Sequence, residues 1–111
     1  MNPIDLAFTP ALEQAQLIRR KEISPLELVE LYLERIQRLD QQLGSYFTVM
    51  ADLALADAKA KTEILGKNEV SHLPPFFGVP ISIKDLTSVA GVRCTYGTPA
   101  LMDQIATYDD G

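Results

Sequence analysis

The chain has 111 residues, 47% of them hydrophobic, which is enough for one small globular domain with a modest core. Its formal net charge of −5 argues against a dedicated nucleic-acid binder, because such proteins present a basic surface. The only cysteine, Cys94, excludes an intrachain disulfide, and a single histidine, His72, gives no support for a metal site. No secretory signal is recognisable and no apolar run approaches the roughly 20 residues that cross a bilayer, so we expect a cytoplasmic location and no membrane contact.

Two helices are predicted in the first part of the chain. A short one covers residues 12–20. A longer one begins at Ser24, a suitable N-cap, because Pro25 occupies the first helical position and Glu27 completes a capping box. Gly44 is expected to end it. Apolar residues recur along this helix at three- and four-residue spacing, at Val29, Tyr32, Leu33, Ile36, Leu39 and Leu43.

A strand, a helix and a second strand are predicted next. Residues 46–50 have the aromatic and β-branched composition of a strand. An alanine-rich helix is expected from about residue 51 to Leu65, with Gly66 at its end. After a loop, the alternation of Val, Ile and Ile over residues 79–83 predicts the second strand. The order of elements favours an α/β layered domain with a mixed or parallel sheet, two helices preceding a β-α-β unit.

The second predicted strand ends in Lys84 and Asp85. In α/β sheets the rim at the carboxyl ends of the strands is where chemistry is usually located. Burial lowers the pKa of an amine, and a neutral amine can accept a proton, so Lys84 is a candidate general base. Two alternatives are a lysine whose amine reaches solvent and a lysine that forms a Schiff base.

Neighbouring residues admit simpler interpretations. Asp85 either orients the loop that follows Lys84 or is a turn residue that accepts hydrogen bonds from nearby backbone. Ser82 is interpreted as a strand serine and Cys94 as a small buried residue. Gly97 is expected to form a tight turn with positive φ.

Residues 78–86, Gly-Val-Pro-Ile-Ser-Ile-Lys-Asp-Leu, closely resemble the amidase signature family. The segments Val89–Arg93 and Thr95–Thr98 extend the resemblance. In that family the matching lysine belongs to a Ser-cisSer-Lys triad that hydrolyses carboxamides. The resemblance therefore implies a mixed sheet between helix layers, Lys84 as the catalytic residue, and no metal or organic cofactor.

The resemblance also implies that the Gly/Ser-rich segment with both triad serines lies beyond Gly111. Residues 1–111 would then form a single, incomplete amidase-signature domain, and we expect this chain to be inactive alone. The implied enzyme hydrolyses a small-molecule amide through an acyl-serine intermediate, without direct nucleic-acid binding. Two alternatives remain open: a non-catalytic fragment that associates with a complementary chain, and the A subunit of a glutamyl-tRNA amidotransferase with its partner subunits.

Overall fold

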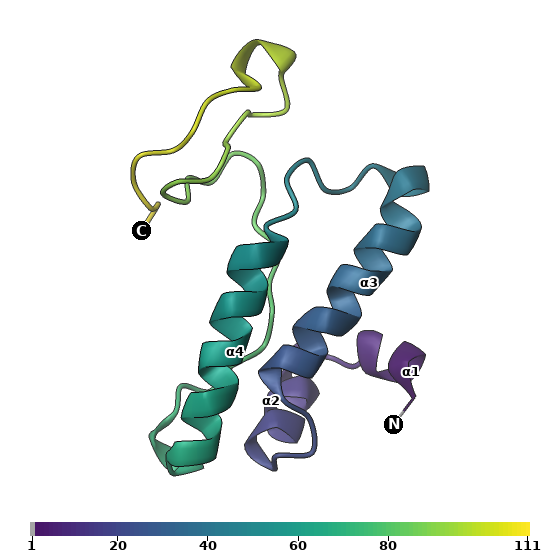
Figure 1. Cartoon of the computed structure of the whole chain (residues 1–111), viewed down its shortest axis with the longest axis vertical. Helices are drawn as coiled ribbons and strands as arrows, with labels where there is room; N and C mark the ends of the chain where they lie inside the picture. The colour runs from purple at the N-terminus through teal and green to yellow at the C-terminus, as the bar shows by residue number, and fades with distance from the viewer. Residues whose placement is uncertain (1) are drawn as a thin grey trace. The chain divides into compact units, whose positions relative to one another are not determined.

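The computed structural model describes residues 2–111, which divide into two compact units. Unit 1 is Met1–Pro80 and unit 2 is Ile81–Gly111, and each is described by itself. Unit 1 is helical (Figure 1) and contains α1 (Pro3–Ala7), α2 (Ala11–Arg19), α3 (Pro25–Leu43), α4 (Ala51–Lys67) and the 3₁₀ turn η1 (Val70–His72). Unit 2 contains one 3₁₀ turn, η2 (Pro99–Leu101). No helix within residues 2–111 has the length and apolar character required to span a bilayer.

The longest helix, α3, begins and ends as the sequence predicts. The Ser24 hydroxyl accepts a hydrogen bond from the Glu27 backbone N–H at 3.0 Å. The Glu27 carboxylate accepts in turn from the Ser24 N–H at 3.1 Å, which completes the capping box. Gly44 ends the helix with a φ of 62°, a left-handed conformation that glycine adopts without steric cost.

The other helices differ from the sequence prediction mainly at their ends. The helix α1 was not predicted, although its signals are present: the Asn2 side chain caps it and proline follows at the first position. The helix α2 starts and ends one residue earlier than predicted. The helix α4 continues through Gly66 to Lys67, because the side chain of Asn68 accommodates the end by donating to the Ile64 carbonyl at 2.8 Å.

The core of unit 1 lies where its helices converge. Its buried members are Leu6, Ile18, Leu28 and Leu65. Partly buried side chains surround them, namely Leu17, Ile23, Leu31, Tyr32, Leu73, Phe77 and Val79. The helices α3 and α4 pack side by side (Figure 1), so that Leu28 and Leu65 join the same cluster. Burial of these side chains supplies the main stabilising free energy of unit 1.

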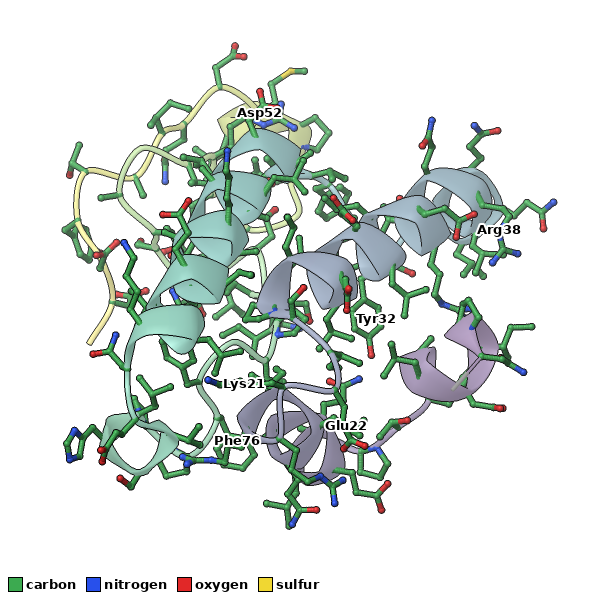
Figure 2. The ribbon with its side chains drawn as sticks, turned by 60° about the horizontal axis from the view of Figure 1, so that its bottom comes forward. Lys21, Glu22, Tyr32, Arg38, Asp52 and Phe76 are labelled. Carbon is green, nitrogen blue, oxygen red and sulfur yellow. The ribbon has the colours of Figure 1, made fainter. Side chains whose placement is uncertain are left out.

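Buried polar groups tie the short helices to this core. Gln14 donates to the Leu6 carbonyl at 3.2 Å and to the Tyr32 hydroxyl at 2.7 Å. The Tyr32 hydroxyl then donates to the Ala7 carbonyl at 2.8 Å, which closes a network between α1, α2 and α3. Figure 2 shows Tyr32 projecting from α3. Such a network fixes one arrangement of the short helices, because a buried polar group without a partner is costly.

The predicted α/β fold is wrong, because residues 2–111 contain no strand and their regular structure is helical. Residues 46–50 and 79–83 are both irregular. A strand needs a neighbour that pairs with its N–H and C=O groups, and no backbone hydrogen bond of the described chain reaches residues 81–83. Ile81 is 82% exposed, so the apolar alternation does not bury a face either.

Unit 2 is held together by backbone hydrogen bonds between two passes of the chain. An isolated antiparallel bridge joins Arg93 to Ile105. On either side of it, the N–H of Cys94 donates to the Gln104 carbonyl at 3.0 Å and the N–H of Ala106 donates to the Val92 carbonyl at 3.0 Å. These bonds bring residues 91–94 and 104–106 together as a short ladder.

Candidate functional site

Lys84 lies in unit 2 at the beginning of a turn. Its carbonyl accepts a hydrogen bond from the Thr87 N–H at 3.0 Å, so that Asp85 and Leu86 occupy the centre of the turn. The Lys84 side chain is exposed, as is that of Ser82. The structure thus places the predicted base on an accessible turn and not at the buried end of a strand, next to a heavily hydrogen-bonded side chain.

That neighbouring side chain is Asp85, whose oxygens accept hydrogen bonds from a segment about ten residues away. Its carboxylate accepts from the Thr95 N–H at 2.7 Å, from the Thr95 hydroxyl, and from the Gly97 N–H at 3.2 Å. Its backbone carbonyl accepts from the Tyr96 N–H at 2.9 Å and from the Cys94 thiol at 3.8 Å. Three consecutive backbone N–H groups, of residues 95–97, therefore converge on Asp85.

The turn held by Asp85 contains a strained residue. Tyr96 has a φ of 53°, a left-handed conformation that costs a non-glycine residue roughly 1–2 kcal/mol. Gly97 follows with a φ of 72°, which confirms the predicted positive-φ turn. The hydrogen bonds from Thr95, Tyr96 and Gly97 to Asp85 offset this strain. The Tyr96 ring remains 57% exposed.

The electrostatics of this turn follow from the same contacts. The Thr95 hydroxyl, the Thr95 N–H, the Gly97 N–H and the positive charge of Arg93 lower the pKa of the Asp85 carboxyl, against an opposing effect of desolvation. Asp85 is therefore a carboxylate at neutral pH. The electrostatic effect of Cys94, desolvation, and the electrostatic effects of Tyr108 and Asp110 raise the pKa of Tyr96.

Two further aspartates hold the end of unit 2 to the loop after Lys84. The Asp110 carboxylate accepts from the Ser88 N–H at 2.6 Å, and the Asp110 N–H donates to the Ser88 carbonyl at 2.9 Å. The Asp109 carboxylate accepts from the Ala90 N–H at 2.8 Å. These contacts join residues 109–110 to the backbone of residues 88–90.

The remaining residues singled out from the sequence do not join this cluster. Cys94 is buried with 1% of its surface exposed, as predicted. His72 lies in η1 of unit 1. Within residues 2–111 no three His, Cys, Asp or Glu side chains are grouped so that they could hold a metal ion. Thr95 was missed as an Asp85 partner, although its segment was part of the motif recognised in the sequence.

Unit 1 has a shallow hollow near the start of α3 that contains none of these residues. The turn between α2 and α3, with Lys21 and Glu22 (labelled in Figure 2), forms one side. Lys21 has a φ of 59°, and the Glu22 carboxylate pairs with Arg20 at 2.8 Å. Ser24 and Glu27 line it as well, but their hydrogen-bonding groups are used in the capping box. The hollow is therefore not part of the candidate site around Lys84.

Comparison with known proteins gives matches to amidases and to amidotransferase subunits. The amidase family profile matches residues 27–111, a range that includes Lys84 and Asp85. A candidate amidase from Synechocystis sp. is 48% identical over 108 residues, which are 96% of this chain and 21% of that protein. The candidate amidase AmiB2 of Mycobacterium bovis is 42% identical over 98 residues, 88% of this chain and 21% of that protein.

One component of a multi-subunit enzyme matches at similar strength. The A subunit of the glutamyl-tRNA(Gln) amidotransferase of Methylococcus capsulatus is 39% identical over 97 residues, 87% of this chain and 19% of that protein. The chain thus spans about a fifth of the length of the curated relatives it matches. No solved structure matches the chain significantly.

Proposed function

Because the chain belongs to the amidase family, we propose that it contributes Lys84 as the general base of an enzyme that hydrolyses carboxamides. The observation that carries this proposal is the family match over residues 27–111, which includes the lysine motif. Residues 1–111 then form part of one amidase-signature domain. The two triad serines belong to the polypeptide that completes it.

The proposed reaction is acyl transfer to serine and then to water. The Lys84 amine accepts a proton from the serine in the cis peptide, which accepts one from the nucleophilic serine as its oxygen attacks the amide carbon. The C–N bond breaks as the proton returns to the leaving ammonia or amine. Water then attacks the acyl-serine ester and releases the carboxylic acid. These steps need only side-chain acids and bases.

The local geometry supports this assignment of Lys84. Its backbone is held on the carboxyl side, by the Thr87 hydrogen bond and by the five hydrogen bonds that Asp85 accepts. A catalytic base has to stand in a defined place to be effective, because small displacements of reacting groups slow proton transfer. The exposed amine is accessible to a serine-bearing segment.

A substrate-independent test uses a fluorophosphonate probe, which reacts covalently with activated serines. Residues 1–111 replace the matching amino-terminal segment of the Synechocystis relative, and labelling is followed by mass spectrometry. We expect labelling of one serine in this chimera, and its loss in the Lys84→Ala and Lys84→Arg variants. Labelling that persists at the original rate in a folded Lys84→Ala chimera would contradict the role of the lysine. Lys67→Ala, at the end of α4, is the matched control.

A second candidate function is the A subunit of a glutamyl-tRNA amidotransferase. It is favoured by the match of four such subunits at 35–40% identity. The chimera distinguishes the two candidates when assayed with glutamine as ammonia donor. A stand-alone amidase releases ammonia from simple amides without other proteins, whereas an amidotransferase subunit requires its partner subunits and charged tRNA for full turnover.

We also infer that the 111-residue chain alone is inactive, because the nucleophile is assigned to another segment. The isolated chain should show neither probe labelling nor amide turnover. Turnover that Lys84→Ala abolishes in the isolated chain would contradict this inference. If the chimera is not labelled while the intact Synechocystis relative is labelled under the same conditions, the result would favour a non-catalytic fragment instead.

A further inference from the structure

One side chain beside Lys84 has more hydrogen-bond partners than a turn requires. An aspartate in a β-turn ordinarily accepts one or two hydrogen bonds from backbone N–H groups within a few residues. The partners of Asp85 are instead residues 94–97, and they use both its carboxylate and its carbonyl. The turn itself is closed by the hydrogen bond from the Thr87 N–H to the Lys84 carbonyl, without the Asp85 side chain.

We propose that Asp85 is a positioning residue for Lys84. Asp85 directly follows the lysine and fixes its backbone through the hydrogen bonds with the turn of residues 94–97. Asp85 can have this role only if the function proposed above is correct. The carbonyl of Asp85 accepts from Tyr96 while its carboxylate accepts from Thr95 and Gly97, so the backbone and the side chain are both fixed. Rotation of the Asp85–Leu86 peptide would withdraw the carbonyl from the Tyr96 N–H, and rotation of the Asp85 side chain would withdraw the carboxylate from Thr95 and Gly97.

The strain at Tyr96 indicates that the turn is maintained by these contacts. Left alone, a tyrosine with a φ of 53° would relax toward negative φ and withdraw its N–H from the Asp85 carbonyl. Gly97 shares its N–H between the Asp85 carboxylate and the Thr95 hydroxyl, each at 3.2 Å. The conformation of the turn and the position of Asp85 are therefore mutually dependent.

The ionised carboxylate is needed for the full set of hydrogen bonds, because every partner of Asp85 in this turn is a donor. Asn at this position would offer one oxygen and one NH₂ group, and the NH₂ group would face either the Thr95 hydroxyl or an N–H. Asp85→Asn therefore keeps the size of the side chain but removes some of the hydrogen bonds that the carboxylate accepts. Asp109 offers a matched control, because its carboxylate also accepts a backbone N–H in unit 2 but holds Ala90.

The test measures the rate of fluorophosphonate labelling in the completed chimera at several probe concentrations. For Asp85→Asn we expect the limiting rate to fall about 10- to 100-fold, while the probe concentration at half-maximal rate stays within about twofold. Asp109→Ala removes one backbone contact of unit 2 and should leave the limiting rate near that of the wild type, and the melting temperatures of both variants are measured in parallel. Equal effects of the two variants on the limiting rate would show that Asp85 acts through stability alone.

A second variant keeps the test decisive if Asp85→Asn does not fold. Thr95→Val removes the hydroxyl, which donates to the Asp85 carboxylate and accepts from the Gly97 N–H, and we expect a fall of about fivefold in the limiting rate. If both single variants fold, the double variant should be no slower than Asp85→Asn alone, because the two residues act as one unit. Additive effects, or a Thr95→Val rate equal to wild type, would overturn the positioning role.

The outcomes separate this inference from the proposed function. A wild-type chimera that is not labelled, or that is labelled equally after Lys84→Ala, contradicts the proposed function and this inference with it. A wild type that is labelled in a Lys84-dependent way, together with a normal rate for Asp85→Asn, contradicts the role of Asp85 only.

Discussion

At the scale of single residues, Asp85 shows how one carboxylate can determine the path of a loop. Five hydrogen bonds reach it from residues 94–97, and they compensate for a tyrosine held at positive φ. Hydrogen bonds to an ionised acceptor are stronger than neutral ones. The turn should therefore depend on the ionisation of this single group.

The first prediction concerns the response of this turn to acid. The hydroxyl and N–H of Thr95 lower the folded-state pKa of Asp85 below 3.8, so the unfolded chain binds a proton more readily than the folded one. The stabilisation is thus present above pH 3.8 and is lost as the pH falls through the folded-state pKa. We expect the amide protection factors of Thr95 and Gly97, from hydrogen exchange normalised to intrinsic rates, to decline in this range.

The control for this prediction is Asp85→Asn, because the asparagine amide does not titrate in this pH range. Its protection at Thr95 and Gly97 should be lower than that of the wild type at neutral pH and should change little on acidification. The same acid dependence in both proteins would show that another group controls the turn.

The second prediction concerns Gly78, which has a φ of 82°. A Cβ at this position would lie 2.6 Å from Cγ of Pro25 and 3.4 Å from Cδ1 of Ile18. Gly78→Ala combines backbone strain with overpacking, so we expect a loss of about 2 kcal/mol or more in the free energy of unfolding. Urea denaturation followed by helical circular dichroism measures it.

Two other glycines separate the contributions to that loss. Gly44 has a φ of 62° and open space around it, so Gly44→Ala should show the strain alone, about 1 kcal/mol. Gly66 lies within α4 with open space around it, so Gly66→Ala should stabilise the helix by up to about 1 kcal/mol. If Gly78→Ala lowers the free energy of unfolding by no more than Gly44→Ala does, the close approach to Pro25 does not contribute to the loss.

At the scale of elements, helices could be predicted from the sequence and strands could not. The signals of α3 are local: its cap, its proline and its apolar stripe all lie within the helix or beside it. A strand depends on a partner that can be far away in sequence, so the alternation over residues 79–83 could not establish pairing. The helix α1 was missed because five residues are too short to show a period, although Asn2 gave a capping signal.

For the candidate site, the motif pointed to Lys84 as a candidate base, which stays a prediction. It also drew attention to Asp85, because both residues stand in a recognisable run. The pairing of Asp85 with Thr95 and Gly97 could not be derived, since it depends on how the loop between them closes. The sequence did offer a hint, because Thr95–Thr98 carried part of the family resemblance.

The third prediction tests the capping box of α3. Ser24→Ala removes the hydroxyl that accepts from the Glu27 N–H, and we expect a loss of about 1 kcal/mol in the free energy of unfolding. Glu34→Gln is the control, because it breaks an exposed ion pair with Arg38 on the same helix. That change should cost only a few tenths of a kcal/mol. Equal losses in urea denaturation would mean that the cap is no more important than the surface pair.

At the scale of the whole chain, the two units differ in how they are stabilised. Unit 1 buries large apolar side chains from several helices, including Leu6, Ile18 and Leu28. The buried residues of unit 2 are small, namely Ser88, Cys94, Thr95 and Ala106, and hydrogen bonds hold its backbone. A 31-residue segment of this kind buries too little apolar surface to be stable by packing alone. Carboxylate hydrogen bonds, such as those of Asp85 and Asp110, therefore contribute a larger share of the stability of unit 2.

The last prediction tests the core of unit 1 with two leucines of the same helix. Leu28 is 0% exposed, whereas Leu43 at the end of α3 is 69% exposed. Leu28→Ala leaves a cavity among Leu6, Ile18 and Leu65, so we expect a loss of about 2–5 kcal/mol in the free energy of unfolding. Leu43→Ala removes the same atoms from water-exposed surface and should change it by less than about 0.5 kcal/mol. Both are measured by urea denaturation of the intact chain. A Leu43→Ala loss as large as that of Leu28→Ala would show that the end of α3 is covered in solution, and that the stabilising core extends beyond the cluster around Leu28.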